Sequence, residues 1–242
     1  MKSIEKLKFG IFGGSGKMGQ AVQTVVQEKN QEPYIFVGKT KSSEFSFSVN
    51  DLKNIEVELL KDTDVWVDFS SAEGLLDLIK RTPSKTPIVS GSTGLTVKQF
   101  NYLKKAAEQR PIFWASNMSL GLWSFRKALE SFSFISDFDF AIDEVHHNKK
   151  KDKPSGTALT LQKDLEKAVN KKIELPQAHR LGGVFGIHTV YAASQNEIIT
   201  FQHQALNRKV FAEGAVQAAR WLVRQKNGLY SMDDMLLKGK TK

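Results

Sequence analysis

A glycine-rich turn close to the N-terminus limits the fold of this 242-residue chain more than any other feature. Residues 13–19 read GGSGKMG and fit the spacing G-x-x-G-x-x-G. A short apolar segment, residues 8–12, comes directly before the turn, and apolar residues at helical spacing follow it at positions 18, 21, 22, 25 and 26. A strand, a glycine turn and a helix in this order are typical of a dinucleotide-binding βαβ unit.

The glycines of this turn have a chemical use as well as a conformational one. Without side chains they let backbone amides approach a pyrophosphate, and the N-terminus of the following helix favours its negative charge. The alternative is a turn that needs glycine only for positive φ angles. The βαβ context favours nucleotide binding, with a cation from the lysine of the turn. The expected cofactor contacts here are Gly13, Gly14, Ser15, Gly16, Lys17 and Met18.

The loop after a second expected strand, residues 34–37, bears on the choice between NADH and NADPH. A site that prefers NADH usually places an acid there against the ribose hydroxyls. Here Lys39 and Lys41 occupy the loop, and no acid comes before Glu44. A charge-assisted contact from a lysine to a 2′-phosphate would contribute about 1.5–3 kcal/mol. We expect Lys39 to contact the cofactor and NADPH to be tolerated or preferred, although a solvated lysine loop explains the pattern equally well.

Strand and helix signals alternate as far as about residue 117, which predicts a Rossmann-like, doubly wound parallel sheet in an α/β domain. Apolar residues that alternate with polar ones, at 138–143 and 198–204, then predict a C-terminal α+β domain with a mixed sheet. A late apolar helix at 210–224 has no place in that sheet and is expected to return to the first domain. The expected domains are 1–117 with 208–242 for the dinucleotide and 118–207 for substrate binding and oligomerisation. Further strands are expected at 64–69, 87–89 and 111–115, and further helices at 72–80 and after Thr96.

Composition excludes some functions and leaves others open. The chain has no cysteine, so disulfides, thiolate metal sites and dehydrogenases that work through a thiohemiacetal are excluded. No apolar run approaches the ~18 residues of a membrane span, and a cytoplasmic protein without a membrane partner is expected. The net charge of +9 suits either nucleic-acid binding or a cleft that gathers small anions.

The segment 144–157, EVHHNKKKDKPSGT, is the most informative part of the chain. Two adjacent histidines and four lysines in five positions could place a proton donor and cations around an anionic substrate. Ser155 is a good helix cap, and the free amides of Gly156 and Thr157 would form a carboxylate site. A lysine-rich solvated loop before a capped helix is the alternative. No third ligand at the usual spacing accompanies the histidines, so no metal is expected.

Residues 144–158 fit the pattern E-x-H-H-x-x-K-x-D-x-P-S-G-T-A, and through it the chain resembles the family of 4-hydroxy-tetrahydrodipicolinate (dihydrodipicolinate) reductases over nearly its whole length. Lys17 stands where the family usually has arginine, and Gly183 where it usually has aspartate. The other segments that fit are 13–19, 68–70, 91–94, 115–119, 180–182, 186–190, 211–215 and 228–232.

The resemblance implies roles for individual residues. It implies that His146 is the catalytic proton donor and acceptor and that Lys150 is the catalytic lysine. It implies that His147, Ser155, Gly156 and Thr157 bind substrate. It implies further nicotinamide-cofactor contacts at Gly91, Ser92, Thr93, Ala115, Ser116, Asn117 and Met118.

The same resemblance implies an activity. Hydride would pass from NADH or NADPH to a small cyclic dicarboxylate, with loss of water, in lysine biosynthesis through diaminopimelate. The implied assembly is a homotetramer. Three other functions stay open: a different Rossmann oxidoreductase, a cofactor-sensing regulator and a basic nucleic-acid-binding protein. The 144–157 segment argues against the first, and a sensor needs no proton-transfer groups. Nucleic-acid binding would require aromatics interleaved on one basic face, whereas the lysines here cluster at sites that also carry glycine cradles, so no nucleic-acid partner is expected.

Overall fold

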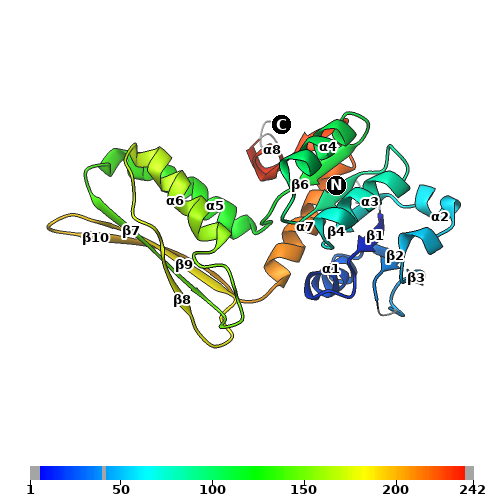
Figure 1. Cartoon of the computed structure of the whole chain (residues 1–242), viewed down its shortest axis with the longest axis horizontal. Coiled ribbons are helices and arrows are strands. Elements are labelled where there is room, and N and C mark those ends of the chain that lie inside the picture. Colours follow the sequence, from blue (N-terminus) through cyan, green and yellow to red (C-terminus); the bar gives the residue numbers. More distant parts are fainter. Residues whose placement is uncertain (1–5, 40–41, 238–242) are drawn as a thin grey trace. The chain divides into compact units, whose positions relative to one another are not determined.

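The computed structural model describes residues 6–39 and 42–237, which divide into two compact units (Figure 1). The first unit runs up to Met118 and resumes at Phe211, and the second is Ser119–Val210. The sequence-based expectation places the second domain at 118–207. Within the described residues, no helix is long and apolar enough to cross a membrane.

The first unit is built on a seven-stranded sheet in the order β11-β6-β5-β4-β1-β2-β3, in which every pair of neighbours is parallel. The strands are β1 (Lys8–Phe12), β2 (Glu32–Val37), β3 (Phe47–Val49), β4 (Val65–Asp68), β5 (Ile88–Ser90), β6 (Pro111–Trp114) and β11 (Gly228–Tyr230). The expected doubly wound parallel sheet is therefore confirmed.

Two of the longer helices of this unit begin at side chains that cap them, Ser71 for α3 (Ala72–Arg81) and Thr96 for α4 (Val97–Ala107). Thr96 forms a capping box with Gln99 at the start of α4, as predicted. The late apolar helix is α7 (Lys209–Leu222), which from Phe211 onward lies in the first unit. The other helices are α1 (Lys17–Glu28), η1 (Leu52–Asn54), α2 (Val57–Lys61) and α8 (Met232–Leu237).

The core of the first unit lies along its central strands. Phe9 and Ile11 on β1 and Trp66 on β4 have no solvent exposure. Burying each of these side chains stabilises the fold by about 1.5–3 kcal/mol. A β carbon at Gly10 would come within 2.6 Å of the Trp66 ring, so a glycine is needed for this large side chain to pack on β1.

The second unit has a four-stranded mixed sheet in the order β10-β9-β7-β8, which confirms the predicted sheet type. Only the β7–β8 pair is parallel; β7–β9 and β9–β10 are antiparallel. Apolar side chains of α6 and α5 pack with Ile142 and Val190 on one face of this sheet (Figure 1). The elements are α5 (Leu120–Ala128), η2 (Leu129–Ile135), β7 (Asp139–His146), α6 (Gly156–Val169), β8 (Gln177–Arg180), β9 (Gly186–Ala193) and β10 (Ile198–Ala205).

Strand β7 differs from the sequence-based expectation because it continues through Glu144 to His146. Both residues lie on the same face as Phe140 and Ile142, and both are buried. Pairing across the sheet sets Glu144 opposite His188 on β9 and His146 opposite Arg180 on β8. These polar side chains can extend a buried face because they contact one another.

Candidate active site

The expected cofactor contacts of the first unit follow the carboxyl ends of its parallel strands. Residues 13–18 follow β1, Lys39 follows β2, residues 91–93 follow β5 and residues 115–118 follow β6. Parallel strands bring these ends to one edge of the sheet. The chain runs outward through β2 and β3 on one side of β1 and returns through β4 and β5 on the other, so the order reverses between β1 and β4. Such a switch point is where open α/β sheets bind nucleotides.

The glycine turn after β1 is packed too closely to admit side chains at several positions. Gly13 has a φ of +77°, and a β carbon there would lie 2.7 Å from the Phe69 carbonyl oxygen. A β carbon at Gly19 would lie 2.4 Å from the Gly13 carbonyl oxygen. Gly16 is the N-cap of α1, and no side chain within the described residues caps this helix. The backbone amides of the first turn of α1 can therefore donate hydrogen bonds to an anion, such as the pyrophosphate of a dinucleotide.

Asp68, at the end of β4, is a buried centre of hydrogen bonds that sequence analysis did not single out. Its Oδ2 accepts from Ser90 Oγ at 2.6 Å and from Ser92 Oγ at 2.8 Å, and its Oδ1 accepts from the amide of Ser70 at 2.9 Å. Burial raises the pKa of the Asp68 carboxyl, while the hydroxyls of Ser70, Ser90 and Ser92 act in the opposite direction. The Asp68 side chain thus ties the end of β4 to the end of β5.

Lys39 is exposed in the loop that follows β2. The preceding Gly38 lies against the glycine turn, since a β carbon at Gly38 would be 2.4 Å from Ser15 Oγ. This contact brings the position of Lys39 close to the turn after β1. Lys41, the other lysine in the NADPH argument, lies outside the described residues.

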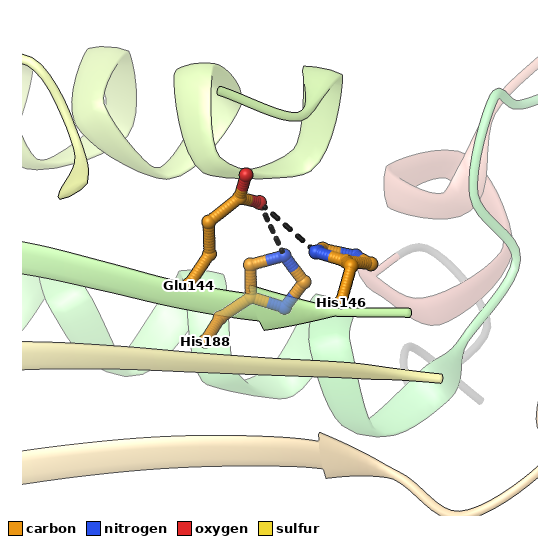
Figure 2. Close-up of side chains that lie close together, drawn as sticks. All are labelled: Glu144, His146 and His188. Atoms are coloured by element: carbon orange, nitrogen blue, oxygen red, sulfur yellow. Dashed lines mark ion pairs between the residues drawn. The ribbon is translucent and has the colours of Figure 1, made fainter. Parts of the chain in front are cut away.

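In the second unit, three buried side chains converge: Glu144, His146 and His188, here called the Glu144–His146–His188 cluster (Figure 2). Glu144 Oε2 lies 3.2 Å from His146 Nδ1 and 3.7 Å from His188 Nε2. The two imidazole rings meet edge to face, with centroids 5.1 Å apart. His188 is a cluster member that sequence analysis missed, although it lies within the family-like segment 186–190.

The other oxygen of Glu144 connects the cluster to a helix and to the neighbouring strand. Glu144 Oε1 accepts from the Ser155 amide at 2.8 Å and from Arg180 Nη2 at 3.1 Å. Burial favours a raised pKa for this carboxyl, but His146 and Ser155 outweigh it and hold the pKa at about 2. The side chain is therefore a carboxylate at neutral pH. Ser155 caps α6 by accepting from the Ala158 amide at 3.1 Å, as predicted.

Arg180 also holds the lysine-rich loop that follows β7. Its Nε donates to the Lys150 carbonyl oxygen at 3.3 Å, and its Nη2 donates to the Asp152 carbonyl oxygen. Lys150 Nζ lies 2.8 Å from Asp152 Oδ1. Burial opposes ionisation of Asp152, yet the ion pair with Lys150 leaves its pKa lowered. The structure thus places His146, Lys150 and the α6 N-terminus around one Glu144–Arg180 pair.

The remaining expected substrate contacts lie at the two ends of this loop. His147 follows β7, and its carbonyl oxygen accepts from the Lys150 amide at 3.1 Å. Gly156 is exposed at the start of α6, and a β carbon there would meet no described atom within 4 Å. Thr157 follows it, half-buried, in the first turn of α6. An open, capped helix N-terminus of this kind suits a carboxylate.

His188 is held in its uncharged form. Burial, followed by the charge of His146, lowers the pKa of His188 to about 4. Glu144 acts in the opposite direction, and His203 and Lys150 lower the pKa by smaller amounts. At neutral pH the ring therefore carries no charge that would repel the cations of the site. The two imidazole nitrogens of His188 have no hydrogen bond among the described residues.

By distance alone, the Glu144–His146–His188 cluster could hold a metal ion, since its three ligand atoms lie within 4.8 Å of one another. The expectation that no metal binds depended on the lack of a third ligand close in sequence to the histidine pair, and His188 lies far from that pair in sequence. The chemistry of the donor set still disfavours a divalent cation, because the Arg180 guanidinium already neutralises the same carboxylate. We therefore describe the cluster as a hydrogen-bonding and ion-pairing group.

A parallel sheet with an uncapped glycine turn at its switch point, joined to a sheet that carries a buried Glu–His pair beside lysines, defines a two-domain nicotinamide-dependent oxidoreductase. Two family models match the chain: "Dihydrodipicolinate reductase, N-terminus" over residues 7–118 and "Dihydrodipicolinate reductase, C-terminus" over residues 121–236. The chain belongs to the dihydrodipicolinate reductase family.

Individual relatives agree with the family models. The chain is 47% identical over 240 residues to a 4-hydroxy-tetrahydrodipicolinate reductase of Bdellovibrio bacteriovorus, covering 99% of this chain and 100% of the relative. It is 38% identical to a reductase of the same name from Rickettsia canadensis, covering 95% and 98%. A dipicolinate-bound dihydrodipicolinate reductase from Paenisporosarcina sp. TG-14 superposes with a TM-score of 0.76 at 21% identity, covering 96% and 100%, and supports the fold.

Proposed function

We propose that the chain is a 4-hydroxy-tetrahydrodipicolinate reductase of lysine biosynthesis through diaminopimelate. The observation that carries this proposal is the grouping of buried His146, Lys150 and the open N-terminus of α6 around Glu144 and Arg180. This grouping offers a proton-transfer group beside cations and a carboxylate cradle, which is complementary to a small cyclic dicarboxylate.

Substrate binding is assigned to the two ends of the lysine-rich loop. One substrate carboxylate would accept hydrogen bonds from the amides of Gly156 and Thr157 and from the Ser155 region, where α6 presents its N-terminus. His147 and Lys150 would contact the same molecule from the β7 side of the loop. The dipicolinate-bound relative from Paenisporosarcina carries a cyclic dicarboxylate, which agrees with this substrate class.

The nicotinamide cofactor supplies the hydride, and the first unit supplies its binding site. Residues 13–18 would contact its pyrophosphate, while residues 91–93 and 115–118 would hold its nicotinamide end at the same sheet edge. Lys39 would pair with the 2′-phosphate of NADPH, so NADPH would be at least as good a cofactor as NADH.

The proposed reaction requires one proton as well as one hydride. The hydride replaces the hydroxyl group of the substrate, and that hydroxyl leaves as water after taking up the proton. His146 is the proposed proton donor, and Lys150 stabilises the charge that develops on the substrate. His188 stays neutral and does not compete for the proton, because its pKa is lowered to about 4 by burial.

The proposed assembly is a homotetramer in the cytoplasm. Its contacts would involve the sheet of the second unit, where β10 alternates between exposed and half-buried side chains and Ile198 is 71% exposed. An edge strand with exposed apolar residues is a surface on which subunits can pair.

The experiment follows oxidation of NADPH and of NADH by the purified protein, with substrate made freshly by the preceding synthase. Wild-type turnover, reduced about 100-fold or more in His146→Ala and Lys150→Ala with cofactor binding retained, is the expected result. A folded wild-type protein that turns over with neither nucleotide would contradict the proposal and favour a cofactor-sensing role.

A further inference from the structure

The buried carboxylate of Glu144 has contacts that the proposed reaction does not explain. Its side chain has no solvent exposure, and all its polar neighbours belong to the second unit. Oε1 accepts from Ser155 and Arg180, while Oε2 faces the two imidazole rings of the cluster (Figure 2). A charged group buried this deeply is costly unless it is paired, so its pairing indicates what it does.

We propose that Glu144 is a positioning residue that holds the free His146 imidazole with its proton on Nδ1, so that Nε2 takes up a second proton from solvent and then, from the imidazolium, donates it to the substrate. The same carboxylate fixes the distance between His146 and the N-terminus of α6. This inference deepens the proposed function and rests on it for the role of Nε2, but the state of the His146 ring can be measured without any turnover.

Two buried atoms of the cluster would lack a partner without a proton on His146 Nδ1. Glu144 Oε2 and His146 Nδ1 are both buried, and neither has a hydrogen-bond partner that meets strict geometric criteria within the described residues. They lie 3.2 Å apart, whereas His188 Nε2 is 3.7 Å from the same oxygen. A proton on His146 Nδ1 allows these two atoms to pair after a small ring rotation, and leaving both unpaired would be costly.

The other ring nitrogen of His146, Nε2, lies beside a glycine. A β carbon at position 186 would lie 3.0 Å from His146 Nε2, but the residue there is Gly186. The start of β9 therefore leaves room beside Nε2 that any other residue would reduce. With Nδ1 directed at Glu144, Nε2 is the nitrogen that remains for the substrate.

The contacts of Arg180 explain why a carboxylate is needed at position 144 instead of a neutral acceptor. Arg180 Nη2 contacts Glu144 Oε1, and the same guanidinium binds the carbonyl oxygens of Lys150 and Asp152. Ionised Glu144 neutralises this partly buried cation. The side chain consequently links His146, the Lys150 loop and the α6 cap through a single charged group.

The test uses two variants and one control on the same strand. In Glu144→Gln, the amide oxygen must stay toward Ser155 and Arg180, which both donate hydrogen bonds, so the amide NH2 faces His146 Nδ1. An NH2 donor there favours a proton on Nε2, which is the wrong tautomer. Glu144→Asp keeps the charge. Asp143→Asn makes the same charge change on the opposite face of β7, away from the cluster.

The first readout is the tautomer of His146 in the wild-type protein, from long-range ¹⁵N–¹H correlation spectra assigned with His146→Asn. The expected result is a proton on Nδ1 in wild type and in Asp143→Asn, and on Nε2 in Glu144→Gln. A wild-type His146 with its proton on Nε2 would overturn the proposal. This outcome is decisive even if Glu144→Gln does not fold.

The second readout is the pH profile of kcat/KM. Two ionisable groups contact the His146 ring directly, Glu144 on β7 and His188 on β9. Arg180 on β8 pairs with Glu144, the charges of His203 on β10 and Lys150 in the loop act on His188, and Asp152 pairs with Lys150. Loss of the carboxylate should move the alkaline limb to lower pH and reduce kcat on the order of 100-fold or more, with cofactor KM nearly unchanged. Glu144→Asp should recover part of the rate.

Two outcomes would overturn the assignment in the second readout. One is a folded Glu144→Gln protein with wild-type kcat and an unchanged profile, and the other is wild-type activity that is lost on chelation and restored by Zn²⁺, which would make the cluster a metal site. Wild-type protein with no turnover but a proton on Nδ1 would instead contradict the proposed function while leaving the placement of the ring intact.

Discussion

Gly214 of α7 lies so close to Met118 that a β carbon at 214 would be 1.8 Å from the Met118 carbonyl oxygen. This contact joins the late helix to the end of the segment that follows β6, within the first unit. A shift of the helix or of that backbone would cost free energy, because the Ala212, Ala215 and Ala219 side chains of α7 are fully buried in a close-packed interior.

Gly214→Ala should therefore destabilise the protein by about 1–3 kcal/mol through overpacking. Since Met118 is among the expected cofactor contacts, the KM for the nicotinamide cofactor should rise as well. Thermal or denaturant unfolding of the variant, compared with Gly183→Ala at an open position, measures the first effect. A Gly214→Ala protein as stable as wild type would show that the contact relaxes without cost.

Asp68→Asn should weaken cofactor binding more than it slows turnover. Asparagine keeps only one of the two oxygens. Either the hydroxyl groups of Ser90 and Ser92, which both donate to Oδ2, or the amide and hydroxyl of Ser70, which donate to Oδ1, therefore lose their acceptor, and the ends of β4 and β5 are less well held. We expect the cofactor KM to rise about tenfold, equivalent to about 1.4 kcal/mol, with a smaller change in kcat. Asp77→Asn, at an exposed ion pair on α3, is the control, and equal effects of the two substitutions would contradict the prediction.

Gly186→Ala should reduce kcat while leaving cofactor binding unchanged. The added methyl group would lie 3.0 Å from His146 Nε2 and would occupy space that the substrate needs or displace the ring. Steady-state kinetics of the Gly186→Ala variant measures the effect. An unchanged kcat would indicate that the substrate approaches His146 from another direction.

Lys39→Ala should change cofactor preference. Loss of a charge-assisted contact of about 1.5–3 kcal/mol would reduce kcat/KM for NADPH by about 10- to 100-fold and leave that for NADH nearly unchanged. Lys29→Ala, at the exposed C-cap of α1, serves as the control. No loss with either nucleotide would assign Lys39 to a solvated loop, and equal losses with both would contradict a contact to the 2′-phosphate.

Acid should destabilise the second unit through His188. Its pKa is lowered by burial from 6.5 to about 4, so the unfolded chain binds more protons than the folded one between these values. Stability from this group is therefore complete above about pH 6.5 and falls by up to about 1.4 kcal/mol per pH unit as the pH drops toward 4. His188→Phe should flatten this dependence in urea titrations, and an equally steep loss in the variant would assign it to other groups that face the cluster, namely Glu144, His146 and His203.

Local signals in the sequence were sufficient for much of the fold. The glycine turn, the capping box at Thr96 and the cap at Ser155 each depend on residues within a few positions of one another. The apolar run at 64–69 likewise located β4. The expected site residues His146, Lys150 and Ser155 came from one continuous segment, and the structure gathers them around Glu144.

The partners from other strands could not be predicted in the same way. Arg180 lies on β8, whose sequence QAHR has no apolar alternation, and His188 lies on β9 forty-odd residues beyond β7. The burial of Glu144 and His146 also escaped prediction, because charged residues are buried only where partners from elsewhere neutralise them. His188 lies in a family-like segment, which was the one available signal for it.

The hydrogen bonds from Arg180 to the Lys150 loop have a consequence for the order of folding. The loop leaves β7 early in the second unit, but the guanidinium that fixes its carbonyl groups arrives 30 residues later, after the whole of α6. A parallel pair such as β7–β8 requires this long crossover, which makes its closure slow compared with local contacts. A nascent chain that ends before β8 would have every residue of the 144–157 motif and still lack the shape that the motif needs.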